Sequence, residues 1–333
     1  MNTPPPRTDH RTAPRTDGLT DTPADTRIPA PAAHDGDTAI HPTSAFARRS
    51  SRQPAARDAI GTLLVEGGHL TPSQMEQVLA EQKVRRRRFG ELVVRLGFAP
   101  QKAVDGALAR QFGYPVARDA SGTLLPPGLV TALNPSMPFA ESIRALRSQL
   151  MLRWFDGSPG RTALAVASVD QGDGKSYVSA NLAVAFSQLG ESTLLIDADM
   201  RNPSQHRLFG LKNRMGLSGL LGGRAGLSEI RKLRSLPRLS VLPAGPLPPN
   251  PQELLGRDVF RHLLDELSSH FNVILVDTPS AQLASDFHVV ARRTGAALIV
   301  ARRDHTRARD VSGLSATLIA SGVQVLGSTL NEY

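Results

Sequence analysis

The chain of 333 residues has material for about two domains, a formal net charge of +9 and no cysteine, which excludes disulfides and thiolate metal sites. No apolar stretch approaches the length of a membrane span, and the N-terminus lacks the hydrophobic segment of a signal peptide, so we expect a cytoplasmic protein. The positive charge would suit nucleic acid or an anionic membrane surface, but charge alone does not decide between partners.

Residues 1–57 are rich in Pro, Thr, Ala, Arg and Asp and poor in large apolar side chains. Such a segment cannot bury enough surface to offset the entropy lost on ordering. Its acids and bases are interspersed, which favours a solvated tail over a basic docking arm. We therefore expect a disordered tail.

An internal repeat begins at Ile60. Residues 60–82 align with residues 89–111 at an offset of 29, so that Gly61 matches Gly90. Each copy predicts a short helix, a turn containing glycine and a longer helix, hence a small helical domain over residues 58–115. The basic run at residues 83–88 between the copies has no interleaved aromatic residue, so we expect a solvated turn and no specific nucleic acid partner.

The two copies resemble the N-terminal domain of the type II secretion and type IV pilus assembly ATPases. Some members of that family bind cyclic di-GMP through an arginine and the backbone of each copy. The resemblance implies that Arg88 contacts cyclic di-GMP, whereas Ala59 stands at the corresponding position of the first copy.

A linker marked by proline and glycine is predicted over residues 116–138, followed by a helix that opens the domain of residues 139–333. Glu141, Arg144 and Arg147 recur at every third position and so lie along one side of this helix. Taken alone, such a triplet predicts a salt-bridged surface.

The stretch Ser168–Ser176, SVDQGDGKS, lies between an apolar run and a helical pattern. A strand, a glycine-rich turn and a helix that opens with Lys-Ser together predict a phosphate-binding loop, with Lys175 at the β and γ phosphates and Ser176 at Mg²⁺. Val169 occupies the place of the usual leading glycine, so a purely structural turn remains an alternative for the loop alone.

Two further apolar runs each end in aspartate: Thr193–Asp197, with Asp199 two residues later, and the run that ends at Asp277. Carboxylates at the carboxyl ends of parallel strands are typical of Mg²⁺ and phosphate sites. Further apolar runs at residues 239–245, 296–302 and 323–331 alternate with helical segments. We therefore predict an α/β fold, a doubly wound parallel-sheet P-loop NTPase domain behind the helical repeat.

Together with Pro249–Leu255, these motifs resemble the Walker A, A′ and B motifs of the bacterial tyrosine kinases. With the N-terminal repeat, the chain is most similar to the tyrosine autokinases associated with chain-length determinant proteins in exopolysaccharide gene clusters. The resemblance implies ATP and Mg²⁺ as cofactors and a homo-oligomeric ring held by Glu141, Arg144 and Arg147. It also implies a membrane chain-length determinant as partner and a position at the inner membrane through that partner.

The resemblance further implies roles for single residues. Lys175 would neutralise charge on the phosphates, and Asp197 would orient or deprotonate the attacking tyrosine hydroxyl. Asp199 would assist at the metal or with subunit geometry, and Arg201 would pair either with phosphate or with a carboxylate. The expected metal ligands are Ser176, Asp197 and Asp277, and the expected nucleotide contacts are Gly172, Asp173, Gly174, Lys175, Ser176, Tyr177 and Asn331.

The family usually ends in a tyrosine cluster, but this chain has three tyrosines in all, and Tyr333 is the expected acceptor. Two alternatives stay open. The first, a partitioning or cell-division ATPase, would carry a lysine where this chain has Asp170, which argues against it. The second is a catalytically weak, nucleotide-dependent scaffold of the polysaccharide export machinery.

Overall fold

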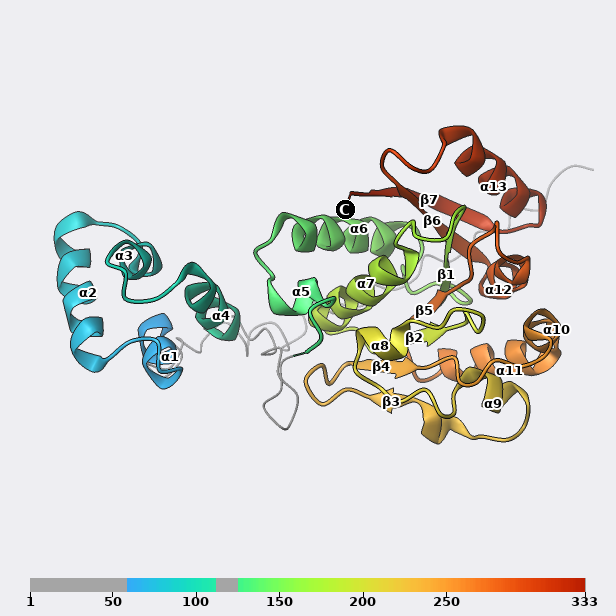
Figure 1. The fold of residues 1–333 in the computed structure, drawn as a ribbon, viewed down its shortest axis with the longest axis horizontal. Coiled ribbons are helices and arrows are strands. Elements are labelled where there is room, and N and C mark those ends of the chain that lie inside the picture. The colour runs from blue at the N-terminus through green and yellow to red at the C-terminus, as the bar shows by residue number, and fades with distance from the viewer. Residues whose placement is uncertain (1–58, 112–124, 333) are drawn as a thin grey trace, which may run out of the picture. The chain divides into compact units, whose positions relative to one another are not determined.

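The structure, a computed structural model, describes residues 59–111 and 125–332 (Figure 1). The predicted disordered tail, Tyr114 and Tyr333 lie outside these ranges. None of the helices within them is both long enough and apolar enough to cross a membrane.

Residues 59–111 form the two helix pairs that the repeat predicts. The helices are α1 (Ile60–Glu66), α2 (Pro72–Arg85), α3 (Phe89–Arg95) and α4 (Gln101–Gln111). Thr71 caps α2 in a capping box with Gln74, which stabilises the first turn of the longer helix. Leu64, Val78 and Leu92 are among the side chains buried between the four helices.

Glycine at the repeated position lets the short helix approach the long helix of its own copy. A Cβ on Gly61 would lie 3.1 Å from the sulfur of Met75, and one on Gly90 would lie 2.6 Å from Val104. Both contacts join residues fourteen positions apart. The repeat in sequence is thus a repeat in packing.

Residues 125–332 fold around a seven-stranded sheet with the strand order β3-β4-β2-β5-β1-β6-β7. All neighbours are parallel except β3, which runs antiparallel to β4 at one edge. The strands are β1 (Ala163–Ser168), β2 (Thr193–Asp197), β3 (Arg231–Lys232), β4 (Leu239–Leu242), β5 (Val273–Asp277), β6 (Ala296–Arg302) and β7 (Gln324–Asn331). The predicted α/β fold with a mostly parallel sheet is confirmed.

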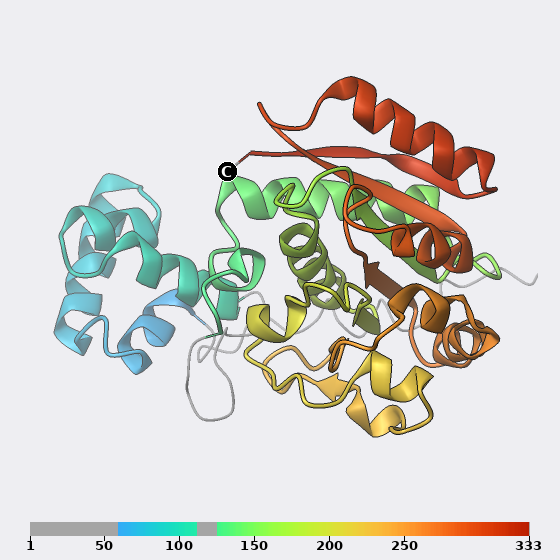
Figure 2. The same cartoon turned by 45° about the vertical axis from the view of Figure 1, so that its right-hand side comes forward.

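Helices cover both faces of the sheet, because successive side chains of each strand point to opposite faces (Figure 2). Along β1, Leu164 and Val166 pack on one face, whereas Ala163, Ala165 and Ala167 pack on the other. The first face is covered by α5 (Val130–Leu133), α6 (Pro138–Arg153) and α7 (Lys175–Leu189), and the second by α9 (Leu217–Leu221), α10 (Pro251–Gly256), α11 (Asp258–Ser268), α12 (Asp286–Thr294) and α13 (Ala308–Ala320). The remaining helical turns are α8 (Gln205–Leu208) and η2 (Leu227–Glu229).

Residues 125–138 belong to this α/β part, although the sequence predicted them as linker. Leu129 is fully buried in the core on the α7 side, and Asn181 of α7 holds the segment in place. Its amide donates to the carbonyl of Gly128 (3.0 Å) and its oxygen accepts from the N–H of Thr131 (2.9 Å). The prolines and glycine of this stretch shape a packed turn, which composition alone did not distinguish from a linker.

Candidate active site

The predicted phosphate loop joins β1 to the N-terminus of α7. Gly172 and Gly174 have φ angles of +92° and +87°, which side chains with a Cβ rarely adopt. The loop therefore curls as the sequence predicted and leads directly into Lys175, the first residue of α7. The N–H groups of the first helical turn point toward this loop and favour an anion there.

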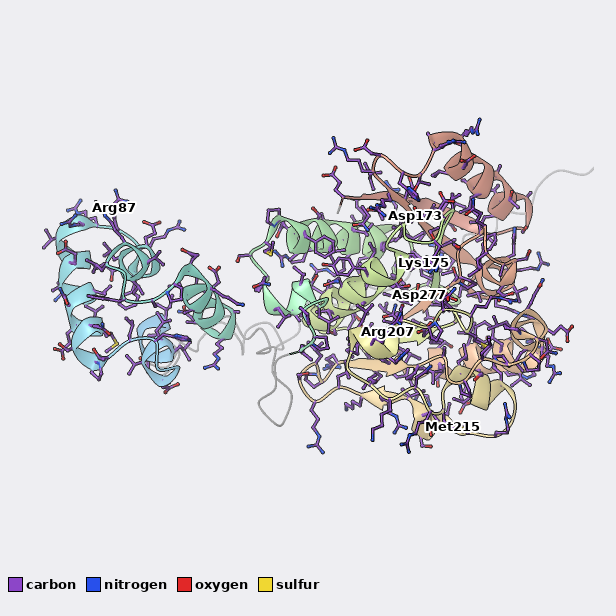
Figure 3. All side chains as sticks on the ribbon, in the orientation of Figure 1. Arg87, Asp173, Lys175, Arg207, Met215 and Asp277 are labelled. Carbon is purple, nitrogen blue, oxygen red and sulfur yellow. The ribbon has the colours of Figure 1, made fainter. Side chains whose placement is uncertain are left out.

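Lys175 lies among carboxylates at the end of the sheet (Figure 3). Its Nζ is 3.3 Å from Oδ2 of Asp199 and 3.5 Å from the hydroxyl of Ser176. Burial by itself lowers the pKa of Lys175, but Asp277, Asp199 and Asp197 together outweigh it and raise the pKa above its ordinary value. The side chain therefore carries a positive charge where phosphate oxygens would lie.

The carboxylates come from two neighbouring strands in register. Asp197 at the end of β2 pairs with Asp277 at the end of β5, and both side chains are fully buried. Oδ1 of Asp197 accepts from the N–H of Asp199 (3.2 Å), and Oδ2 accepts from the N–H groups of Ser204 and Gln205 (3.0 Å each). Asp197 thus fixes the backbone that follows β2 and also contributes charge.

Burial raises the pKa of both Asp197 and Asp277. The charge of Asp277 raises the pKa of Asp197 further, whereas Lys175 opposes the rise at Asp277. Oδ2 of Asp277 accepts a hydrogen bond from Gln205 (2.8 Å), but its buried Oδ1 has no hydrogen-bond partner among the described residues. An unpartnered buried carboxylate oxygen is costly unless a cation or water completes it.

Gln205 is a site residue that the sequence analysis missed. Its side-chain amide donates to the carbonyl of Ser176 (3.0 Å) and to Asp277, while its own N–H donates to Asp197. One fully buried residue, through its side chain and its backbone N–H, therefore joins the three segments that carry the predicted motifs. No periodicity or spacing marked Gln205, because the segment after β2 is irregular.

The guanidinium of Arg201 is held by a carboxylate. It forms a two-pronged ion pair with Asp286 at the start of α12, with Nε 2.9 Å from Oδ2 and Nη2 3.3 Å from Oδ1. Asp286 is buried, so this pair ties the segment after β2 to the segment after β5. The sequence had left open whether Arg201 pairs with phosphate or with a carboxylate, and here its partner is a carboxylate.

Two residues predicted to contact nucleotide, Asp173 and Asn331, instead form hydrogen bonds that hold the phosphate loop in place. Oδ1 of Asp173 accepts from the hydroxyl of Thr306 (2.6 Å), and Oδ2 accepts from the N–H of Asp170 (2.9 Å). The amide of Asn331, at the end of β7, donates to the carbonyl of Asp173 (3.1 Å). We name Asp173, Thr306 and Asn331 the loop clamp.

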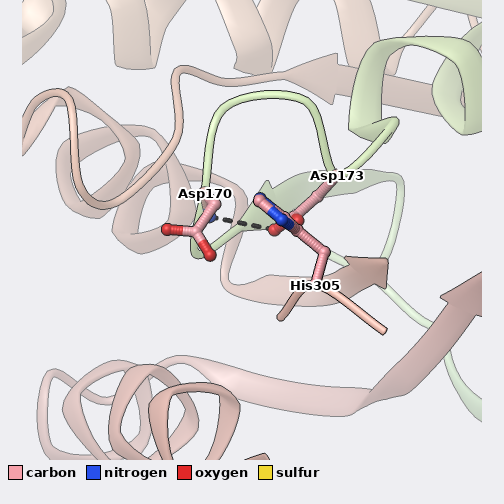
Figure 4. Close-up of side chains that lie close together, drawn as sticks. All are labelled: Asp170, Asp173 and His305. Carbon is pink, nitrogen blue, oxygen red and sulfur yellow. Dashed lines mark hydrogen bonds between the residues drawn. The ribbon is translucent and has the colours of Figure 1, made fainter. Parts of the chain in front are cut away.

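Asp170, Asp173 and His305 lie side by side (Figure 4), with one ligand-type atom of each within 4.8 Å of the others. Metal ligands commonly have such a composition. Both oxygens of Asp173 already accept hydrogen bonds, so the arrangement is better explained as loop support.

The predicted oligomerisation triplet on α6 separates into two environments. Arg144 donates to Glu141 (2.9 Å) and to the carbonyl of Pro135 (2.7 Å), whereas Arg147 turns inward and donates to the carbonyl of Ala185 on α7 (3.1 Å). Tyr177 packs against Phe139 of α6, with ring centroids 5.1 Å apart and the ring planes tilted by 40°. Arg88 precedes α3 in the helical part, at the position that Ala59 takes before α1.

Comparisons with known proteins identify this class of site. The family model described as ParA, NUBPL iron-transfer P-loop NTPase, matches residues 161–222, which carry the phosphate loop and the segment after β2. The putative tyrosine-protein kinase CapB of Staphylococcus aureus is 36% identical over 200 residues, which cover 60% of this chain and 86% of CapB. This chain belongs to the family of bacterial tyrosine-protein kinases.

Other bacterial tyrosine kinases match this chain at similar sequence identity. The tyrosine-protein kinase etk of Escherichia coli K12 is 36% identical over 198 residues, but this region is 27% of the etk chain, so the present protein spans about a quarter of that relative. The solved kinase domain of the E. coli tyrosine kinase ETK matches 61% of this chain with a TM-score of 0.58 at 35% identity. The chimerical protein CapA2B2 matches 68% of it with a TM-score of 0.57 at 32% identity.

The protein is thus a nucleotide-binding, bacterial-type tyrosine kinase. These relatives favour the kinase over the partitioning ATPase, the alternative against which Asp170 argued. The matches cover up to about two thirds of the chain, and the resemblance of the helical repeat to secretion ATPases stays a prediction.

Proposed function

We propose that this kinase is an ATP- and Mg²⁺-dependent protein tyrosine autokinase that regulates the polymerisation, export and chain length of an exopolysaccharide. The proposal is supported chiefly by the position of Lys175, a largely buried cation at the phosphate loop with three carboxylates around it. Family membership supports the choice of tyrosine as the acceptor. A relative from Klebsiella pneumoniae is described as a putative tyrosine-protein kinase in the cps region.

The donor set at the end of the sheet fits Mg²⁺, which prefers oxygen ligands. Asp277 has a buried oxygen without a hydrogen-bond partner among the described residues, and the hydroxyl of Ser176 lies near enough to Asp277 to lower the pKa of that carboxyl. In our proposal Ser176 and Asp277 hold the ion, and Asp197 contributes through water. When bound, Mg²⁺ would neutralise charge on the β and γ phosphates.

The side chains of the chain itself would carry the remaining steps. Lys175 and the N–H groups at the start of α7 bind and orient the triphosphate. The tyrosine oxygen attacks the γ-phosphorus while the bond to the β-phosphate oxygen breaks and ADP leaves. The hydroxyl proton passes to Oδ1 of Asp197, which accepts one backbone N–H and is made more basic by its burial beside Asp277. Asp199 holds Lys175 in place.

The acceptor tyrosine remains a proposal. Tyr177 packs against Phe139, and we propose that Tyr333 instead enters the site of a neighbouring subunit in a ring held by Glu141, Arg144 and Arg147. Phosphopeptide mapping of the active full chain should find phosphate on Tyr333. An active protein with unmodified Tyr333 would refute the assignment.

We further propose a membrane chain-length determinant as the partner that brings the kinase to the cytoplasmic side of the inner membrane. Cyclic di-GMP binding at Arg88 also stays a prediction, supported by the repeat geometry that Arg88 and Ala59 share as the residues before α3 and α1. Calorimetry of the full chain and of Arg88→Ala tests it. Equal heats for the two proteins would contradict it.

Incubating the full chain with γ-labelled ATP and Mg²⁺ tests the central proposal. Wild type should place label on protein tyrosine, Lys175→Ala should abolish labelling, and Lys212→Ala, an exposed lysine elsewhere, should leave it unchanged. Free phosphate without labelled protein would indicate an ATPase instead. Labelling that persists in Lys175→Ala would exclude this loop as the active site, and neither product would favour the scaffold.

A further inference from the structure

The positive charge of this chain is concentrated in one segment. Residues 202–252 contain eight basic residues and one acidic residue, Glu229, and therefore carry +7 of the net +9. The remaining 282 residues carry +2 between them. The phosphate loop does not account for this cluster of basic residues, because Lys175 and the carboxylates near it lie outside the segment.

All eight basic side chains are exposed, and those of β3 itself, Arg231 and Lys232, lie on the strand at the edge of the sheet. They extend from α8, past α9 and η2, through β3 and into the turn before β4; Figure 3 labels Arg207 and Met215 within this segment. We name them the β3-edge face: Arg207, Lys212, Arg214, Arg224, Arg231, Lys232, Arg234 and Arg238.

Most charges of the β3-edge face are not neutralised within the described residues, where only Arg231 of the eight has an ion pair, with Glu229 at 2.8 Å. Some basic side chains elsewhere on the domain are paired with acids. Arg293 lies 3.6 Å from Asp258, and Arg303 lies 2.9 Å from Glu332. The β3-edge face therefore projects a field of one sign into solvent.

The composition of the segment distinguishes among anionic partners. Phe209 is its single Phe, Trp or Tyr and is buried, so the face offers no ring on which nucleic acid bases could stack. The bases are spread over several loops and a strand, so they do not converge as they would around one small anion. Leu227 and Leu247 of the same segment are 36% and 62% exposed. Dispersed cations in a segment that also exposes leucines fit a lipid surface, where headgroups are mobile and the interface is partly apolar.

We propose that the β3-edge face binds the anionic lipid headgroups of a membrane surface. Each basic residue near such a surface contributes about 1 kcal/mol, so several together suffice for reversible attachment of the domain. The proposal does not depend on the phosphoryl transfer proposed above. It gives the kinase a direct contact with the membrane, in addition to any membrane partner.

Co-sedimentation of the full chain with vesicles tests the proposal. Wild type should bind vesicles of phosphatidylcholine mixed with phosphatidylglycerol, fail to bind phosphatidylcholine alone, and be released by salt as the charges are screened. The triple variant Arg224→Glu, Lys232→Glu and Arg234→Glu should bind the mixed vesicles more than about 100-fold more weakly, because reversal adds repulsion to the lost attraction.

A matched control reverses three exposed bases of the helical part, Lys83→Glu, Arg87→Glu and Lys102→Glu, with the same change in net charge. It should keep most of the wild-type affinity. A loss equal to that of the β3-edge variant would mean that total charge, not this face, decides binding, and the proposal would fail. Wild-type binding that does not distinguish the two vesicle types would overturn it as well.

Replacement of Arg224, Lys232 and Arg234 by Gln keeps the test informative if the charge reversal unfolds the protein. That variant should weaken vesicle binding about 100-fold while the thermal melting curve and the labelling by ATP stay as in wild type. Unchanged vesicle binding by this folded variant would refute the β3-edge face.

Discussion

The carboxylate cluster at the phosphate loop and the β3-edge face both concentrate charge, but one is buried and the other exposed. Asp197 and Asp277 are fully buried within hydrogen-bonding reach of a few fixed groups, whereas all eight bases of the β3-edge face lie in solvent. In the low-dielectric interior each charge acts strongly on its neighbours, while exposed charges are screened by water and salt. Substitutions in the carboxylate cluster should therefore have large, coupled effects, and those on the β3-edge face should have small, additive effects.

The largest effect should follow from Asp277→Asn. The substitution replaces the proposed metal-binding carboxylate by a neutral amide but preserves shape and an oxygen that can accept from Gln205. We expect tyrosine labelling to fall by about 100-fold or more, as for other groups that stabilise charge in a transition state. Asp265→Asn, on an exposed turn of α11, is the control that should stay active. An active Asp277→Asn protein would remove Asp277 from the mechanism.

The same variant should be more stable than wild type when nucleotide and metal are absent. Because burial raises the pKa of Asp277 and Asp197 above the unfolded value, the folded state binds their protons more readily, and stability is lost as pH rises from about 4 through the folded pKa values. Removing the charge of Asp277 removes its repulsion of the Asp197 carboxylate. Each 1 kcal/mol gained corresponds to about 2–4 °C in Tm for a domain of this size.

Melting curves of both proteins across this pH range check the prediction. The Tm of Asp277→Asn should exceed that of wild type most clearly at neutral pH, and the difference should shrink in acid. A variant that melts below wild type at neutral pH would show that the charge of Asp277 stabilises the fold through Lys175.

Gln205→Ala should have the next largest effect, because it cuts the bridge between Ser176 and Asp277 without removing a charged group. We expect about a tenfold loss of labelling together with a higher Mg²⁺ requirement, in line with the outer-shell partners of metal ligands. Gln252→Ala, an exposed glutamine, serves as the comparison. Loss of activity without a change in Mg²⁺ requirement would point to a purely structural role.

Thr306→Val tests the loop clamp with a side chain of nearly the same shape. Removing the hydroxyl leaves Oδ1 of Asp173 without its donor and loosens the phosphate loop. We expect KM for ATP to rise by about fivefold with a smaller change in kcat, since a lost buried hydrogen bond is worth about 1 kcal/mol. Thr317→Val on the exposed side of α13 is the control. An unchanged KM would show that Asn331 alone suffices to hold the loop.

The smallest effects belong to single neutral substitutions on the β3-edge face. Arg234→Gln and Lys232→Gln should each weaken vesicle binding by about fivefold, add in the double variant and vanish at high salt. Vesicle titrations at two salt concentrations measure this. Strong non-additivity would mean that the two bases bind in one defined pocket, and it would contradict the expectation that exposed charges act independently.

Much of the fold was predictable because its patterns are local. The apolar runs before Asp197 and Asp277 became β2 and β5, and the glycines at 172 and 174 took the positive φ values that a phosphate loop needs. The segment at residues 125–138 was misread, because a Pro-Gly turn that packs on α7 has the same composition as an exposed linker. Strand β3, two residues long, left no periodic signal at all.

The sequence by itself determined the identity of the chemical groups and the order of the elements, since strand periodicity, glycine spacing and terminal aspartates are properties of neighbouring residues. It also contained the uneven distribution of basic residues. Only the tertiary structure decided that Gln205 joins three motifs, that Asp286 takes Arg201 and that Thr306 holds Asp173 from 133 positions away. Such partners are brought together by strand order and helix packing, which act across the chain and leave no pattern in a local window.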